Sequence, residues 1–148
     1  MAATSEQLQS LLTYCVDFAT TMLSDSGEFY PFGAALDPTG QVKAVGAHNG
    51  EEHPKPTELY GLLSEAFARE ASSGQIIGAA LAANVDVPTQ FSSPFPDAVR
   101  VALEGADFSR LIYWPYQISR KGLFKKQVEV RFSKPFAVET APQFFKAA

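Results

Sequence analysis

The 148-residue sequence predicts an α+β domain, in which two amphipathic helices pack on one mostly antiparallel sheet of about five or six strands. Two segments place apolar residues at the three-and-four spacing of a helix face, and several shorter segments alternate as strands do. The expected order is helix, two strands, helix, and then three or more strands. Chain length and the lack of an internal repeat indicate one domain over residues 1–148.

The first predicted element is a helix that begins after Thr4 and ends at Gly27. Its apolar residues, from Leu8 to Leu23, fall on one helical face. Thr4 followed by Gln7 has the pattern of a capping box, and Gly27 suits the position that ends a helix.

A proline-containing aromatic stretch, GEFYPFG, follows this helix. Pro31 favours an extended chain, so the rings of Phe29, Tyr30 and Phe32 are expected to cover the helix end and the sheet edge. Gly33 would permit a close backbone approach. Packing is the favoured interpretation. The alternative is the lip of a ligand pocket, because such pockets are lined by aromatic side chains with a few polar groups.

A hairpin and a second helix are expected next. Asp37–Gly40 has the residues of a type I turn and predicts two short strands around it. The second helix follows Pro56 and ends at Gly74. Its apolar stripe consists of Leu59, Leu62, Leu63, Ala66 and Phe67.

Four further strands are predicted. QIIGAALAANVDVP fits a buried strand or a buried helix, and strand is preferred because isoleucines begin it and valines end it. Its small residues would let a helix lie close on a central strand. DAVRVALEG and VEVRFS alternate, with Val99, Val101 and Leu103 on one face of the first. RLIYWPYQI is the fourth, and Pro115, which cannot donate to a ladder, places that part at an edge or bulge.

This element order is similar to that of roadblock and profilin-like domains. FYPFGAALD, IIGAALAANVDVP and DAVRVALEG together resemble a group of small bacterial domains that carry an F-Y-P-F-G-A stretch after the first helix. The resemblance covers most of the chain, and it implies no activity and no functional residues.

Composition and charge argue against several classes of function. The net charge of −4 argues against broad binding to nucleic-acid phosphates. Charge is nonetheless polarised: residues 1–109 hold 14 acidic and four basic residues, whereas residues 110–134 hold seven basic residues and one acidic residue. The single cysteine precludes an intramolecular disulfide. With no membrane-length apolar run and no signal-like N-terminus, a cytoplasmic protein is expected.

Candidate chemical groups are few. HNGEEH brings together His48 and His53, residue types that bind zinc, but its Gly and Pro surroundings predict a solvated loop. Cys15 lies on the apolar helix face, where a free cysteine behaves as a small hydrophobe. No phosphate-loop, dinucleotide or nucleophile-elbow motif occurs. Asp86, Asp97 and Glu104 are of a type that mostly lies on the surface. We therefore expect no catalytic residues and no cofactor.

SRKGLFKKQ, residues 119–127, is predicted to form a basic hairpin tip. Such a tip can present positive charge and an aromatic ring to an acidic partner, including the acidic region of a second copy. The alternative is a solvated hairpin whose phenylalanine folds back on its own sheet. The candidate partner-binding residues are Arg120, Lys121, Phe124, Lys125 and Lys126.

The function expected from the sequence is a noncatalytic protein-interaction module, homodimeric through a sheet edge or an exposed helix face. A second possibility is a small-molecule sensor or carrier. Its candidate pocket residues are Phe29, Tyr30, Tyr113, Trp114 and Tyr116. The third is a metal-dependent hydrolase that uses the loop from His48 to His53.

Overall fold

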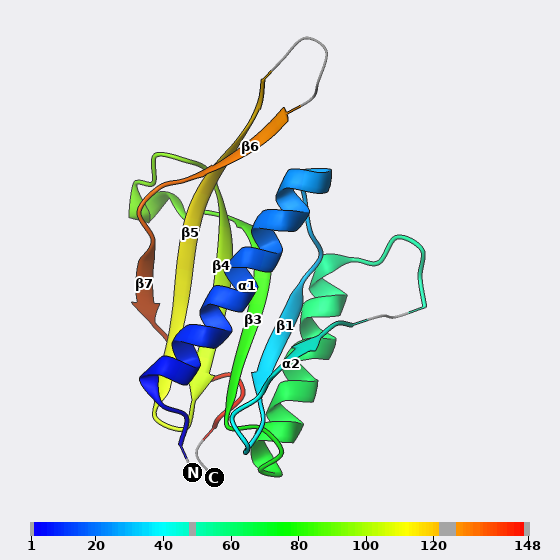
Figure 1. Ribbon diagram of the computed structural model, residues 1–148, viewed down its shortest axis with the longest axis vertical. Coiled ribbons are helices and arrows are strands. Elements are labelled where there is room, and N and C mark those ends of the chain that lie inside the picture. The colour runs from blue at the N-terminus through cyan, green and yellow to red at the C-terminus, as the bar shows by residue number, and fades with distance from the viewer. Residues whose placement is uncertain (1, 48–49, 122–126, 147–148) are drawn as a thin grey trace.

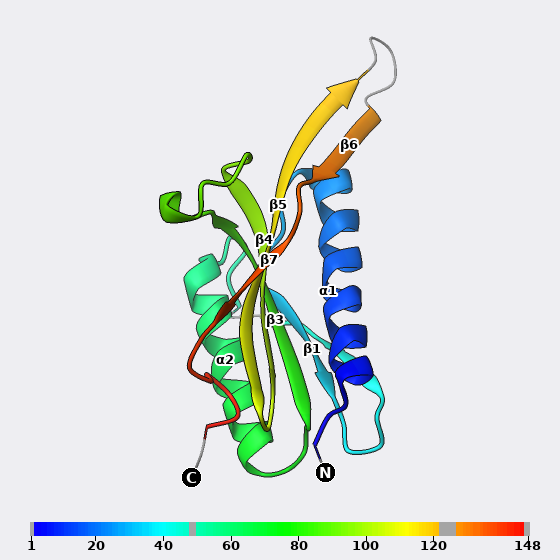
Figure 2. The same ribbon diagram turned by 90° about the vertical axis from the view of Figure 1, so that its left-hand side faces the viewer.

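The computed structural model of the protein describes residues 2–47, 50–121 and 127–146. In these residues one antiparallel sheet lies between two helices, α1 (Ser5–Ser26) on one face and α2 (Pro56–Ser72) on the other (Figures 1 and 2). The strands run in the order β2-β1-β3-β4-β5-β6, and β7 also pairs with β5. Their bounds are β1 Phe32–Leu36, β2 Val42–Val45, β3 Gly78–Asp86, β4 Asp97–Gly105, β5 Phe108–Lys121, β6 Gln127–Phe132 and β7 Phe136–Glu139. The predicted α+β class is confirmed, and β7 is an addition to the predicted strands.

Helix α1 has the predicted caps. The Thr4 hydroxyl accepts a hydrogen bond from the Gln7 backbone N–H at 3.1 Å, and the Gln7 side chain accepts one from the Thr4 N–H at 2.8 Å. Gly27 ends the helix with a φ of +77°, which glycine adopts without steric cost. The buried face consists of Leu8, Leu11, Leu12, Cys15, Ala19 and Leu23.

The predicted hairpin and the second helix are also present. The Gly40 N–H donates to the Asp37 carbonyl at 2.9 Å, closing the turn between β1 and β2. The hydroxyl of Thr39 donates to the Asp37 carboxylate, and this bond is the largest cause of a lowered Asp37 pKa. Helix α2 buries Leu59, Leu63 and Phe67. Within the described residues, neither helix combines the length and the apolar composition that crossing a membrane requires.

Strand β3 is the centre of the sheet, as its small residues predict. It pairs with β1 on one side and with β4 on the other. A Cβ atom on Gly78 would lie 3.2 Å from the Leu11 side chain of α1, and one on Gly33 of neighbouring β1 would lie 2.7 Å from the Phe67 ring of α2. Glycine and alanine therefore let both helices approach the middle of the sheet closely.

Pro115 does not mark an edge, because β5 has neighbours on both sides. β4 pairs along one side of β5, and the other side is shared by β7, opposite residues 110–113, and β6, opposite residues 116–121. Pro115 lies between these two partners, where its carbonyl accepts a hydrogen bond from the Ser133 N–H at 2.9 Å. The N and C=O of a strand residue point to the same side, so the missing donor faces the gap and breaks no ladder bond.

Glu104 of β4 corrects the expectation that such acids lie on the surface, because its exposed fraction is 0%. Its carboxylate accepts hydrogen bonds from the backbone N–H groups of Gln143, Phe144 and Phe145 at 2.8, 2.9 and 3.2 Å. Phe144 also packs edge-on against Phe67, with ring centroids 5.4 Å apart. Glu104 therefore fixes the C-terminal segment, residues 142–146, beside α2 on the same face of the sheet.

Candidate functional site

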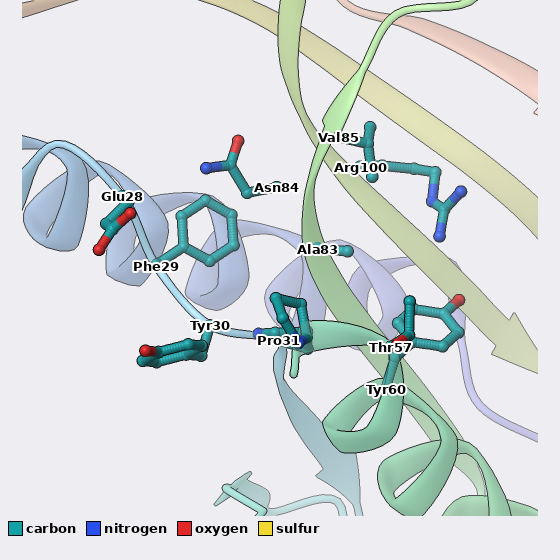
Figure 3. A pocket seen from close by; sticks show the side chains of 11 residues that line it. Glu28, Phe29, Tyr30, Pro31, Thr57, Tyr60, Ala83, Asn84, Val85 and Arg100 are labelled. Atoms are coloured by element: carbon teal, nitrogen blue, oxygen red, sulfur yellow. The ribbon is translucent and has the colours of Figure 1, made fainter. Parts of the chain in front are cut away.

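A cavity of about 520 Å³ opens beside the first turn of α2, between the α1–β1 connection and strands β3 and β4 (Figure 3). Its size is within the range of small-molecule pockets. Apolar side chains form most of the wall. The lining residues are Glu28, Phe29, Tyr30, Pro31, Pro56, Thr57, Tyr60, Ala83, Asn84, Val85 and Arg100.

The aromatic residues that follow α1 have two roles: some pack in the core, and Tyr30 stands at the cavity. The Phe29 ring is buried in the α1 core and meets Phe32 edge-on, with centroids 5.7 Å apart. Tyr30 has an exposed fraction of 47% and stands at the cavity wall. Pro31 keeps the preceding residue, Tyr30, out of the helical conformation, so α1 does not continue through this stretch. Packing thus describes Phe29 and Phe32, whereas Tyr30 is available to a ligand.

Arg100 supplies the positive charge of the cavity. Strand β4 places it opposite Ala83 of β3, and its guanidinium lies over the Tyr60 ring, 5.5 Å from the centroid. Figure 3 shows the guanidinium directed towards Tyr60 and Thr57 of α2. Its Nε atom is shielded from solvent and has no hydrogen-bond partner among the described residues. Within the described part of the chain, Arg100 forms no salt bridge.

Asn84 links the cavity to the core on the α1 face. The Tyr116 hydroxyl donates a hydrogen bond to Asn84 Oδ1 at 2.7 Å. Burial raises the Tyr116 pKa, and the nearby Asp97 raises it further. The phenol therefore remains a protonated donor at physiological pH and holds Asn84 in place.

The structure does not bring all five predicted pocket residues together. Phe29 and Tyr30 line the cavity, whereas Tyr113, Trp114 and Tyr116 lie outside its lining. Tyr113 stacks on Phe136 with centroids 5.0 Å apart, and Trp114 packs against the α1 core. Neighbouring residues of β5 point to opposite faces of the sheet, so their proximity in the sequence cannot place them in one pocket.

Arg100 and Tyr60 were missed by the sequence reasoning. Arg100 appears in the sequence as one polar position of an alternating strand, and Tyr60 directly follows Leu59, the first residue of the buried stripe of α2. One signal was present: Arg100 lies between Ala98 and Ala102, two small residues on the same face of β4 that leave room for a long side chain.

His53 and the single cysteine are not among the lining residues of this cavity. His48 is outside the described residues, and His53 is exposed in the connection from β2 to α2. The described residues contain no group of three metal-binding side chains. Cys15 is buried under α1, and burial raises its pKa to about 12, so its thiol is protonated at neutral pH.

The basic hairpin is described only at its base. Arg120 is exposed near the end of β5, and the backbone of Lys121 belongs to the same strand. Phe124, Lys125 and Lys126 lie outside the described residues. Figure 1 shows that the end of β5 and β6 extend beyond α1, away from the body of the sheet.

No family model matches the chain, and no curated protein or solved structure is significantly similar to it. The resemblance to roadblock and profilin-like domains therefore stays a prediction. Function has to be inferred from the residues of the cavity and their geometry.

Proposed function

We propose that this protein is a noncatalytic binding module that takes a small organic molecule into the cavity beside α2. The observation that carries the proposal is a cavity of about 520 Å³ whose mostly apolar wall holds one arginine without a carboxylate partner among the described residues. Binding sites for small molecules combine an apolar wall with a few orienting polar groups in this way.

The position of the cavity supports reversible binding. Its walls come from α2, from β3 and β4, and from the segment that follows α1, so a ligand would contact three parts of the fold. The strands are fixed by antiparallel pairing on both sides. Tyr30 belongs to the connection and is half exposed. A rigid wall and an accessible aromatic ring suit a sensor or a carrier.

A thermal melt against a metabolite panel tests this proposal. A ligand present at about 100 times its Kd should stabilise the protein by about 2.7 kcal/mol, and each kcal/mol should raise the Tm of a domain of this size by about 2–4 °C. Val85→Trp, which places an indole at the cavity wall, should abolish the shift. Val42→Trp, on an exposed strand outside the cavity, should retain it.

Two results would contradict a site in this cavity. A compound that stabilises the Val85→Trp variant as much as the wild type binds elsewhere on the molecule. A panel in which no compound raises the Tm of the wild type removes the support for small-molecule binding. Circular dichroism of both variants checks that the fold is retained.

Strand β2 favours protein interaction, in the form of a homodimer, as a second candidate function. In the described residues β2 lies at the end of the sheet and pairs only with β1. Val42 on β2 and Phe18 on α1 are large apolar side chains with exposed fractions of 38% and 41%. An exposed edge strand can pair with a second copy, although the short length of β2 and its Lys43 reduce that tendency.

Light scattering after size-exclusion chromatography tests the homodimer. We expect the wild type to have twice the chain mass and Val42→Glu to have the mass of one chain. A wild type that stays monomeric at the highest soluble concentration would rule the dimer out.

A further inference from the structure

We infer that the ligand of the cavity beside α2 is a monocarboxylate with a flat apolar body, bound through its carboxylate to Arg100. This inference rests on the proposed function and names the ligand class of that site. Three features of the cavity carry it: the unpaired arginine, the balance of charge around it and the aromatic wall opposite.

Arg100 lines the cavity, and no carboxylate of the described residues pairs with it. A guanidinium carries five N–H donors and no acceptor. Here the Nε donor is buried without a partner, and the ring beneath the group is Tyr60. A carboxylate at the guanidinium would pair the charge and accept from its outer N–H groups, in the planar geometry that arginine favours.

The charged side chains around the cavity favour a ligand with one negative charge over a ligand with two. The charged side chains of the lining are Arg100 and Glu28, which balance each other. A phosphate monoester carries close to two charges at neutral pH. One arginine beside one glutamate therefore favours a carboxylate over a phosphate.

The wall of the cavity determines the body of the ligand. Tyr30 and Pro31 form one side, and Tyr60 and Val85 belong to α2 and β3 across the opening (Figure 3). Aromatic rings gain most from partners that stack on their face or meet them at the edge. A ring system attached to the carboxylate can make such contacts while its charged end remains at Arg100.

A matched probe series tests the ligand class. The probes are 2-naphthoate, 2-naphthalenemethanol, 2-naphthylmethylamine and 2-naphthyl phosphate, which share one ring system and differ in the polar end. Backbone amide NMR titrations of the full chain give the affinity and the location of each. We expect 2-naphthoate to bind about tenfold or more tightly than the alcohol, the gain of one charge-assisted hydrogen bond. The shifted resonances should include Tyr30, Ala83 and Asn84.

Arg100→Met separates the anchor from the cavity, because methionine keeps an apolar stem and removes the charge. It should lower the affinity for 2-naphthoate to that for the alcohol and leave the affinity for the alcohol unchanged. Arg110→Met is the matched control. Arg110 pairs with Glu139 at 3.2 Å outside the cavity, so its replacement should not change the binding of any probe.

The outcomes distinguish the ligand class from the binding function. Equal affinity for acid and alcohol, or a 2-naphthoate affinity that survives Arg100→Met, would overturn the carboxylate anchor while leaving cavity binding in place. Tighter binding of 2-naphthyl phosphate would overturn the preference for one charge, and tighter binding of the amine would assign the anchor to Glu28. If no probe shifts the cavity resonances up to its solubility limit, both the ligand class and the proposed function fail.

Discussion

The two faces of the sheet are covered in different ways. On the α1 face, the buried cluster joins α1 to β1, β3, β4 and β5 through aliphatic and aromatic side chains, with the Tyr116 hydroxyl as its polar tip. On the other face, α2 packs chiefly on β1 and β3, and the C-terminal segment covers Glu104. The cavity opens on this second face, beside Arg100.

This difference suggests separate roles for the two faces, one in stability and the other in ligand binding. An apolar face gains free energy with every buried methylene group and needs no polar partners. A face that buries a carboxylate and a guanidinium N–H must pair each of these groups, or the unpaired group lowers the stability. Glu104 is satisfied by three backbone donors, whereas Arg100 has an unpaired Nε. The α1 face therefore has the larger buried apolar cluster, from which we expect the larger share of the stability, and the α2 face holds the candidate site.

The largest effect is expected from a cavity in the α1 face. Leu11→Ala removes a side chain with an exposed fraction of 0% and should lower the free energy of unfolding by about 2–5 kcal/mol. Leu63→Ala on α2 is the matched comparison, because Leu63 is 2% exposed on the other face of the sheet. Urea unfolding followed by circular dichroism measures both. A similar loss for the two variants would mean that the α1 face is not the main source of stability.

Glu104→Gln should have the next largest effect. The amide keeps one acceptor oxygen in place of two, so some of the backbone N–H groups of the C-terminal segment lose their partner, at about 1–3 kcal/mol each. The segment should then be cleaved more readily in limited proteolysis, while α1 stays protected. Glu65→Gln, at an exposed position of α2, is the control. Unchanged cleavage after Glu104→Gln would show that the carboxylate does not hold the segment.

Gly33→Ala tests how closely α2 approaches the sheet. The added Cβ would lie 2.7 Å from the Ala80 carbonyl oxygen and 2.7 Å from the Phe67 ring, and relieving this contact should cost about 1–3 kcal/mol. Gly61→Ala on α2 meets no atom within 4 Å and should stabilise the helix by about 1 kcal/mol. Opposite signs of the two changes in chemical denaturation would confirm the close contact. A neutral Gly33→Ala would mean that α2 can move away freely.

Arg100→Met is expected to have the smallest effect on stability. A cation–π contact such as that of Arg100 with Tyr60 contributes about 0.5–1 kcal/mol at an exposed site. Removing the unpaired Nε donor offsets part of the loss of this contact. The free energy of unfolding should therefore change by less than about 1 kcal/mol. Denaturation of this variant beside Leu11→Ala completes the comparison of the two faces. A loss of several kcal/mol would make Arg100 a structural residue.

Much of the local structure follows from short-range patterns. The capping box of Thr4 and Gln7, the turn at Asp37 and the left-handed Gly27 depend on residues a few positions apart. The stripe of α2 predicted the buried Leu59, Leu63 and Phe67 in the same way. The composition of β3 indicated its central place, because a strand rich in glycine and alanine lets helices approach on both sides.

Contacts between segments far apart in the sequence determine which side chains meet. Pro115 lies inside the sheet because two short strands share one side of β5, and Glu104 is buried because a distant segment supplies its donors. The same holds for the cavity, where Arg100 of β4 meets Tyr60 of α2. Periodicity shows which face of an element is apolar, but strand register and the choice of face for each helix depend on long-range packing. Local sequence patterns therefore specify the helices and strands, and long-range packing brings the residues of the candidate site together.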